Sequence, residues 1–184
     1  YHGLGKGLEE DIASVRAFLS EIPQALISYS CSKNFGLYRE RTGLFAYMAS
    51  NPDMKERASS HIASLVRASY SMPPAHGAAI VANILSDESR RQVWETELSD
   101  MRARLTEMRL SFAEELSAQS GSAAYAALRE QQGMFSLLPI APEKAAILAS
   151  EHALYMPRSG RINLAGLTKS NVERAAKLLS TVLK

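Results

Sequence analysis

Residues 30–43 read SCSKNFGLYRERTG and concentrate donor chemistry in one short stretch. The stretch contains a single lysine, Lys33, together with two arginines and several hydroxyl or thiol side chains. Short runs rich in β-branched and aromatic residues lie on either side, at 25–32 and 42–50, and they predict two flanking strands. We therefore expect a strand, a loop and a second strand, with Lys33 presented by the loop.

Lys33 is a candidate for Schiff-base chemistry with a carbonyl compound. A lysine amine reacts well when partial burial and neighbouring cations depress its pKa, and Arg39 and Arg41 lie close in sequence. Ser30 and Arg41 would then hold an anionic group of the bound compound. Pyridoxal phosphate is a carbonyl compound that carries its own phosphate. The alternative from residue types alone is a solvated surface loop.

A second alternative is acyl transfer. Residues 30–33 match the Ser-x-x-Lys motif of penicillin-binding proteins and β-lactamases. Those enzymes also need Ser-Asp-Asn and Lys-Thr-Gly elements, and the sequence contains neither. Such an enzyme would be acylated at Ser30 by a β-lactam and would ignore pyridoxal phosphate, which separates the two hypotheses.

Composition argues against several other classes. The 184 residues carry 21 Lys+Arg against 19 Asp+Glu, which gives no basic field for nucleic acid. A single cysteine and four scattered histidines predict neither a disulfide framework nor a metal site. No apolar run approaches the ~20 residues that span a bilayer, so we expect no membrane partner. The reducing cytoplasm is the expected compartment.

The first half of the chain predicts three helices. Apolar spacing indicates a helix at 8–20, and a second at 52–71 stops before two consecutive prolines. A third covers roughly 75–85, and the sequence SDES at 86–89 offers a break and a cap for a further helix.

That further helix is predicted to be long. Apolar residues at spacings of three and four form a single stripe on a helix of about 29 residues. The Ser/Gly-rich stretch 117–124 marks the turn out of it. The stripe consists of Trp94, Leu98, Met101, Leu105, Met108, Phe112 and Leu116.

The last third alternates between strand and helix. We expect strands at 133–140 and 161–167, with a helix at 141–153 between them. Thr168 is expected to cap the final helix, whose buried face would include Val172, Ala175, Leu179 and Val182. This pattern predicts a small α/β layer.

Five blocks of the sequence together resemble the aspartate and aromatic amino-acid aminotransferases of class I, fold type I. The central block is the lysine stretch, where Ser30, Lys33, the run NFGLY, Glu40-Arg41 and Gly43 match the family's cofactor-lysine segment. The other four blocks occur in the family's order and spacing, at 1–11, 67–78, 131–136 and 159–167.

The resemblance implies pyridoxal 5'-phosphate as cofactor. Lys33 would hold the cofactor covalently and move a proton at the substrate α-carbon. Ser30 and Arg41 would bind the phosphate, and Tyr1 would hydrogen-bond the phenolic oxygen. Ser71 would lie near the phosphate across a dimer interface.

The resemblance also implies the substrates and a homodimer with shared active sites. Arg161 would clamp the substrate α-carboxylate, Phe135 would line the site, and Arg67 would reach the neighbouring subunit's site to pair with a distal carboxylate. The implied reaction moves the amino group of aspartate or an aromatic amino acid to a 2-oxo acid such as 2-oxoglutarate, by a ping-pong mechanism through pyridoxamine phosphate. His2, where the family usually has Gln, and Met72 depart from its pattern and blur substrate choice.

The implied fold is α/β: a fold type I pyridoxal-phosphate-dependent transferase, of which this chain resembles the C-terminal half. We expect 1–74 to be the C-terminal part of the large domain, 75–118 the interdomain helices and 119–184 the small domain. The family's N-terminal half lies outside this sequence, so an exposed sheet edge is expected and activity should require the remainder. The alternative function is a truncated, inactive fragment of such an enzyme.

Overall fold

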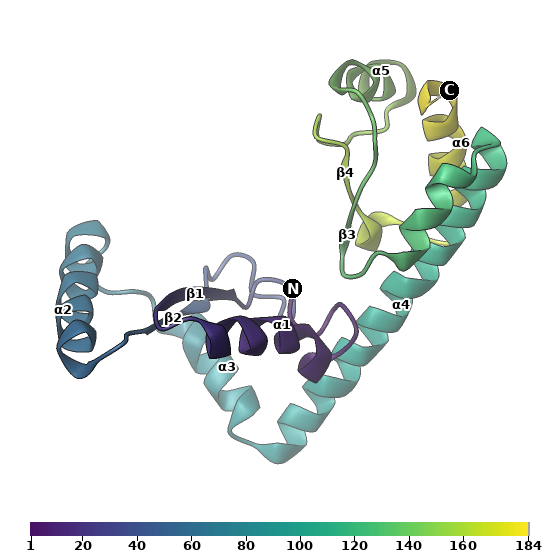
Figure 1. Cartoon of the computed structure of the whole chain (residues 1–184). Coiled ribbons are helices and arrows are strands. Elements are labelled where there is room, and N and C mark those ends of the chain that lie inside the picture. Colours follow the sequence, from purple (N-terminus) through teal and green to yellow (C-terminus); the bar gives the residue numbers. More distant parts are fainter. Residues whose placement is uncertain (184) are drawn as a thin grey trace. The chain divides into compact units, whose positions relative to one another are not determined.

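The computed structural model describes residues 1–183, which form two compact units. The first unit comprises Tyr1–Gly3 and Gly7–Leu98, and the second comprises Leu4–Lys6 and the residues from Ser99 onward. The long helix α4 contributes to both (Figure 1). The domain boundaries inferred from the sequence, after residues 74 and 118, stay a prediction.

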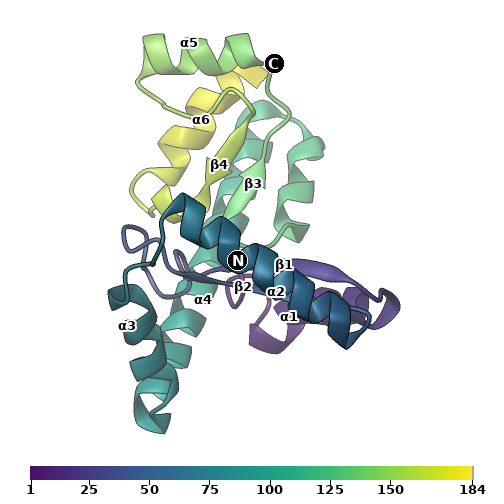
Figure 2. The same ribbon diagram turned by 90° about the vertical axis from the view of Figure 1, so that its left-hand side faces the viewer.

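The described chain is built from helices and short strands (Figures 1 and 2). They are α1 Leu8–Glu21, β1 Ala25–Ser30, β2 Gly43–Met48, α2 Pro52–Ser69, α3 His76–Leu85, α4 Glu88–Ser120, the 3₁₀ helix η1 Ala123–Glu130, β3 Phe135–Leu137, α5 Pro142–His152, β4 Arg161–Asn163, the 3₁₀ helix η2 Leu164–Gly166 and α6 Val172–Leu183.

The strand, loop and strand predicted around Lys33 are confirmed. β1 and β2 pair antiparallel over their whole length, from Ala25 opposite Met48 to Ser30 opposite Gly43. Gly43 is required at this last pair, because a Cβ there would lie 2.2 Å from the Tyr29 carbonyl oxygen. Within residues 1–183 neither outer edge of this two-stranded sheet has a further strand partner. The expected open sheet edge is therefore present, and Leu26 on β1 is 76% exposed.

The first two helices begin and end within two residues of the predicted positions. α1 starts after Gly7 and ends at Glu21, just before Pro23. α2 starts with Pro52 in its first turn, and the Asn51 side chain accepts a hydrogen bond from the Met54 amide at 2.9 Å. Proline fixes a helix end because it has no backbone N–H to donate. A capping side chain fixes one because it accepts a hydrogen bond from a free amide of the first turn.

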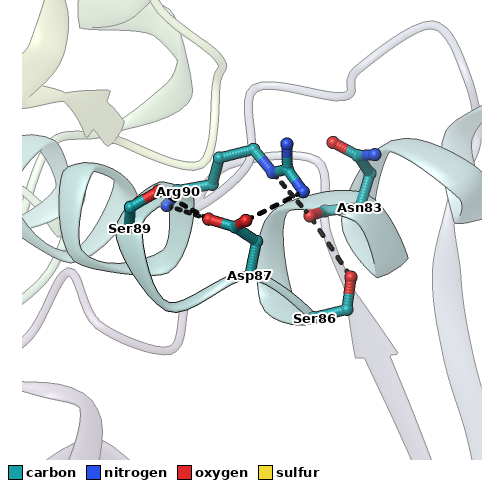
Figure 3. Close-up of polar contacts among 5 residues, drawn as sticks. All are labelled: Asn83, Ser86, Asp87, Ser89 and Arg90. Carbon is teal, nitrogen blue, oxygen red and sulfur yellow. Dashed lines mark hydrogen bonds and ion pairs between the residues drawn. The ribbon is translucent and has the colours of Figure 1, made fainter.

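The break between α3 and α4 is built on Asp87 (Figure 3). Its carboxylate accepts hydrogen bonds from the Ser89 hydroxyl at 2.6 Å and from the Arg90 amide at 2.9 Å. The Arg90 side chain turns back to donate to the Asn83 carbonyl at 3.0 Å. The Ser89 hydroxyl bond, and to a lesser extent the Arg90 amide bond, lowers the pKa of Asp87. The predicted cap at 86–89 is therefore confirmed.

α4 is longer than predicted, at 33 residues, and its apolar stripe is largely buried. Met101 departs from the prediction because it is 41% exposed, and Trp94 is half-buried. The helix continues to Ser120 and ends where Gly121 adopts a φ of 68°, so the chain turns within the predicted stretch 117–124. The buried members of the stripe are Leu98, Leu105, Met108, Phe112 and Leu116.

In the second unit β3 and β4 pair antiparallel over only three residues each, fewer than predicted. Pro139 has no amide hydrogen to continue the ladder, and β4 ends where the Asn163 side chain accepts from the Ala165 amide and starts η2. The predicted α5 is confirmed, with Pro142 in its first turn.

The predicted start of the last helix is wrong. α6 begins at Val172, and Thr168 does not cap it with its side chain. The Thr168 amide donates to the Asn171 side chain at 2.7 Å, and the Thr168 hydroxyl bonds Ser170 at 2.9 Å. Because of these side-chain hydrogen bonds, residues 169–171 form a turn and are not part of the helix.

Candidate cofactor and substrate sites

The lysine loop (residues 30–43) is closed by its own backbone. The Cys31 amide donates to the Thr42 carbonyl at 3.0 Å, which extends the hairpin ladder into the loop. The amides of Phe35 and Leu37 both donate to the Cys31 carbonyl, at 3.3 and 3.4 Å. These bonds hold the loop in a tight turn that presents the lysine.

Trp94 of α4 packs against the lysine loop. Its ring stacks on Phe35 with centroids 4.6 Å apart and planes 9° from parallel. Its indole N–H also donates to the Asn34 carbonyl at 2.7 Å. Asn34 is only 1% exposed, so the residue next to the lysine is fixed by packing and by a hydrogen bond.

The Lys33 amine lies between aromatic rings. Its Nζ is 4.1 Å from the centroid of the Tyr38 ring and 5.5 Å from that of the Tyr1 ring. The residue is half-buried, and no carboxylate within residues 1–183 forms an ion pair with it. The two rings lie close to the amine and no ion pair in the described chain holds it against a carboxylate, so a bound carbonyl compound can reach it.

Arg41 and Ser30 supply donors on the same loop. Arg41 adopts a left-handed backbone with a φ of 53°, and its guanidinium donates to the Tyr38 carbonyl at 3.0 Å. No carboxylate in the described part of the chain pairs with it. The Ser30 hydroxyl donates to the Ser32 hydroxyl at 3.0 Å and accepts from the Ser32 amide at 3.2 Å. Both side chains of the predicted phosphate set are exposed and can meet an anion.

Arg67 and Ser71 form a separate pair at the C-terminal end of α2. The Arg67 guanidinium donates to the Ser71 hydroxyl at 2.7 Å, and Ser71 adopts a left-handed backbone with a φ of 65°. No described hydrogen bond joins this pair to the lysine loop. Both residues are exposed.

Arg161 and Phe135 are brought together in the second unit by the β3–β4 pairing. The guanidinium carbon of Arg161 lies 4.8 Å from the centroid of the Phe135 ring. Both residues line a cavity of about 400 Å³ whose wall also includes Asn163, Asn171 and Arg174. A guanidinium beside an aromatic face, at the wall of a largely apolar cavity, suits a small carboxylate with an apolar or extended side chain.

Several supporting residues were not found by sequence reasoning. Tyr38 contributes the closer ring to Lys33, and Trp94 lies 60 positions from the Asn34 carbonyl that it bonds. Arg109, only 3% exposed, donates to the Ser136 hydroxyl and to the Gly133 carbonyl, and burial lowers its pKa. It thereby fixes the segment around Phe135. No sequence signal marks Arg109 beyond a charged residue on the apolar side of a helix.

Two other kinds of chemistry, attack by a cysteine thiolate and binding of a metal ion, gain no support from the described geometry. Burial raises the pKa of the Cys31 thiol, which disfavours the thiolate needed for attack. Residues 1–183 contain no group of three or more His, Cys, Asp or Glu side chains arranged to hold a metal ion. None of the helices in the described chain combines the length and apolar character needed to cross a bilayer.

A family model described as aminotransferase class I and II matches residues 1–179. The chain belongs to the class I and II aminotransferase family. Two curated members illustrate the similarity. A tyrosine aminotransferase of Rhizobium meliloti (strain 1021) is 47% identical over 181 residues, which cover 98% of this chain and 46% of that protein. The aspartate aminotransferase of Escherichia coli (strain K12) is 39% identical over 183 residues, covering 100% of this chain and 46% of that protein.

Solved aminotransferases match the structure as well. An aromatic amino acid aminotransferase with 3-indolepropionic acid gives a TM-score of 0.93 at 41% identity, covering 99% of this chain and 47% of that one. A Burkholderia pseudomallei aromatic-amino-acid aminotransferase, described as covalently bound to pyridoxal phosphate, gives 0.90 at 35% identity, covering 100% and 46%. The fold type I α/β class inferred from the sequence is thus confirmed, and this aminotransferase chain spans slightly less than half the length of these relatives.

Proposed function

We propose that the protein is a pyridoxal-phosphate-dependent aminotransferase that moves the amino group of aspartate or an aromatic amino acid to a 2-oxo acid such as 2-oxoglutarate. The observation that carries the proposal is the Lys33 amine, held between the Tyr38 and Tyr1 rings without a carboxylate partner in residues 1–183. Family membership supports it, as does the relative of known structure described as covalently bound to this cofactor.

The donor set fits the proposed cofactor. A phosphorylated aldehyde needs an amine for its carbonyl carbon and cationic or hydroxyl donors for its phosphate, and Lys33, Arg41 and Ser30 supply these from one loop. When bound, pyridoxal phosphate supplies the electron sink that stabilises negative charge at the substrate α-carbon. The protein's share is orientation and proton transfer.

Lys33 has two tasks in this proposal. Its amine would bind the cofactor, and the same amine would move the proton at the substrate α-carbon as a general base and acid. Tyr1 lies near enough to assist, with its ring centroid 5.5 Å from Nζ. Its phenol is proposed to donate a hydrogen bond to the cofactor's phenolic oxygen.

Substrate recognition is assigned to arginines. Arg161 binds the α-carboxylate with its planar fork, and Phe135 supports the guanidinium from one face. Arg67 is proposed to pair with a distal carboxylate in the site of a second subunit, with Ser71 near that subunit's phosphate. The protein would then be a homodimer with shared sites, acting in two half-reactions; its cytoplasmic location stays a prediction.

Replacing Arg161 tests the proposal in the full-length protein. With aspartate and 2-oxoglutarate as substrates, Arg161→Leu should lower kcat/KM by roughly two orders of magnitude, because a charge-assisted bidentate contact is lost. The kcat/KM of Arg161→Lys should lie between those of the parent and of Arg161→Leu, since lysine keeps the positive charge but cannot make the bidentate contact. Arg158→Leu, an exposed arginine three positions earlier, is the matched control.

Equal activity of Arg161→Leu and Arg158→Leu would contradict the assignment of Arg161. Absence of transamination from the full-length protein, with both dicarboxylic and aromatic donors, would contradict the proposed function itself.

A further inference from the structure

A chain of hydrogen bonds lies behind the lysine loop and centres on the Tyr29 hydroxyl. The side-chain amide of Asn34 donates to this hydroxyl at 2.5 Å, and His2 Nδ1 lies 3.1 Å from it. The other ring nitrogen of His2 lies 2.8 Å from the Leu8 carbonyl oxygen. The His2 and Tyr29 rings meet edge to face, with centroids 5.7 Å apart.

The direction of each bond is set by the chemistry of its end points. A carbonyl oxygen only accepts, so His2 Nε2 must carry a proton to bond Leu8. With one proton on the ring, Nδ1 is an acceptor and receives the Tyr29 hydroxyl hydrogen. The Tyr29 oxygen in turn accepts from Asn34. A second proton on His2 would make Nδ1 a donor and leave the Tyr29 hydrogen without its acceptor.

These hydrogen bonds connect the segment that carries Tyr1 with the segment that carries Lys33, and the proposed chemistry requires these two residues at fixed relative positions. His2 directly follows Tyr1, and Asn34 directly follows Lys33. Asn34 is 1% exposed and Tyr29 is half-buried, so water competes poorly for these bonds. Burial raises the pKa of Tyr29, which keeps its hydroxyl protonated and able to donate.

We propose that His2 and Tyr29 are positioning residues that act through Asn34 to set the Tyr1 phenol against the Lys33 amine. This inference rests on the proposed function, because it concerns the capture of pyridoxal phosphate by Lys33. Neither residue touches the Lys33 amine in the described contacts, so their effect is exerted on geometry.

Tyr29→Phe in the full-length protein removes the central hydroxyl and keeps the ring. The rate of pyridoxal phosphate capture at Lys33, measured by borohydride trapping and intact mass, should fall roughly fivefold, as expected for one lost hydrogen bond. Nitrogen-15 NMR of His2 should show the proton on Nε2 in the parent and a mixed distribution in Tyr29→Phe. Tyr47→Phe is the matched control, because its hydroxyl donates to the Lys55 carbonyl on the exposed side of the same hairpin.

A second pair of variants separates positioning from folding. His2→Gln keeps an acceptor and a donor and should capture pyridoxal phosphate within about twofold of the parent, whereas His2→Leu removes both and should match Tyr29→Phe. If Tyr29→Phe fails to fold, the comparison of His2→Gln with His2→Leu tests the positioning role instead.

Two results would overturn the inference in distinguishable ways. Capture at the parent rate by Tyr29→Phe and His2→Leu, with the His2 proton still on Nε2, would remove the positioning role and leave the proposed function standing. No Lys33 adduct in the parent protein would remove the proposed function and this role with it.

Discussion

Arg41 and Ser71 adopt left-handed backbone conformations although neither is a glycine. Such a conformation costs about 1–3 kcal/mol and persists where the surroundings hold it. The Arg41 side chain donates a hydrogen bond to the Tyr38 carbonyl, and the Ser71 hydroxyl accepts one from the Arg67 guanidinium. Ala153, the remaining non-glycine residue with positive φ in the described chain, simply ends α5. Local strain is thus concentrated at two of the residues proposed to meet phosphate.

Gly77 tests how tightly the lysine loop is held. A Cβ at this position would lie 1.8 Å from Thr42 Oγ1 and 2.9 Å from Glu40 Cβ. We expect Gly77→Ala to lower the free energy of unfolding by about 1–3 kcal/mol, because the end of the loop must move to relieve the overlap. Urea unfolding measures the loss, and slower pyridoxal phosphate capture at Lys33 should accompany it.

Gly166→Ala is the control for this substitution. No atom lies within 4 Å of the Cβ that it adds, and the backbone there is not left-handed. If the two alanine variants unfold at the same urea concentration, α3 does not hold the lysine loop as the structure indicates.

The sequence predicted Lys33, Ser30 and Arg41 because their chemistry is concentrated in fourteen consecutive residues. The supporting residues could not be predicted in the same way. His2 and Tyr29 are 27 positions apart and meet only once the N-terminal segment packs beside β1. Trp94 reads as one more apolar position of a helix until α4 packs against the lysine loop.

At the scale of elements, strong local signals gave accurate boundaries. α1, α2 and α5 are bounded by proline or by a capping side chain, and each was predicted within two residues. β3 and β4 were predicted too long, since their apolar residues continue past the point where the hydrogen-bond ladder stops. The start of α6 was misplaced because a turn built by Asn171 replaced the cap expected from Thr168.

The start of α4 should depend on pH through Asp87. The Ser89 hydroxyl and the Arg90 amide lower the pKa of Asp87 in the folded protein. A lowered folded-state pKa means that the stabilisation is present above the ordinary Asp pKa, near ~4, and is lost as the pH falls through the folded value. We therefore expect Asp87→Asn to lower the Tm at neutral pH and to have little effect in strong acid.

Thermal unfolding of Asp87→Asn across this pH range checks the sign. Asp100→Asn, at an exposed position in the same helix, should change the Tm little at any pH. A Tm difference for Asp87→Asn that stays constant down to strong acid would show that the carboxylate charge is not what caps α4.

At the scale of the whole molecule, the proposed site residues are divided between the two units. The lysine loop, Tyr1 and the Arg67–Ser71 pair belong to the first unit, and the Arg161–Phe135 pair belongs to the second. Family membership predicted from the five sequence blocks is confirmed, and the chain spans about 46% of the curated relatives described above. The homodimer that the resemblance implies, with shared active sites, stays a proposal.

Arg67→Leu tests the shared site in the full-length enzyme. The kcat/KM for aspartate should fall by roughly two orders of magnitude, because the distal carboxylate loses its cation, while turnover of phenylalanine should change little. Arg57→Leu, another exposed arginine of α2, is the control. Equal losses for aspartate and phenylalanine would show that Arg67 does not read the distal carboxylate.

The central claim is that Lys33 binds pyridoxal phosphate covalently. The most direct test is the intact mass of the full-length protein after borohydride reduction with this cofactor, compared with Lys33→Ala and with Lys55→Ala, an exposed lysine of α2. The account predicts one adduct in the parent and in Lys55→Ala and none in Lys33→Ala. An adduct that survives in Lys33→Ala, or no adduct in the parent, would contradict it.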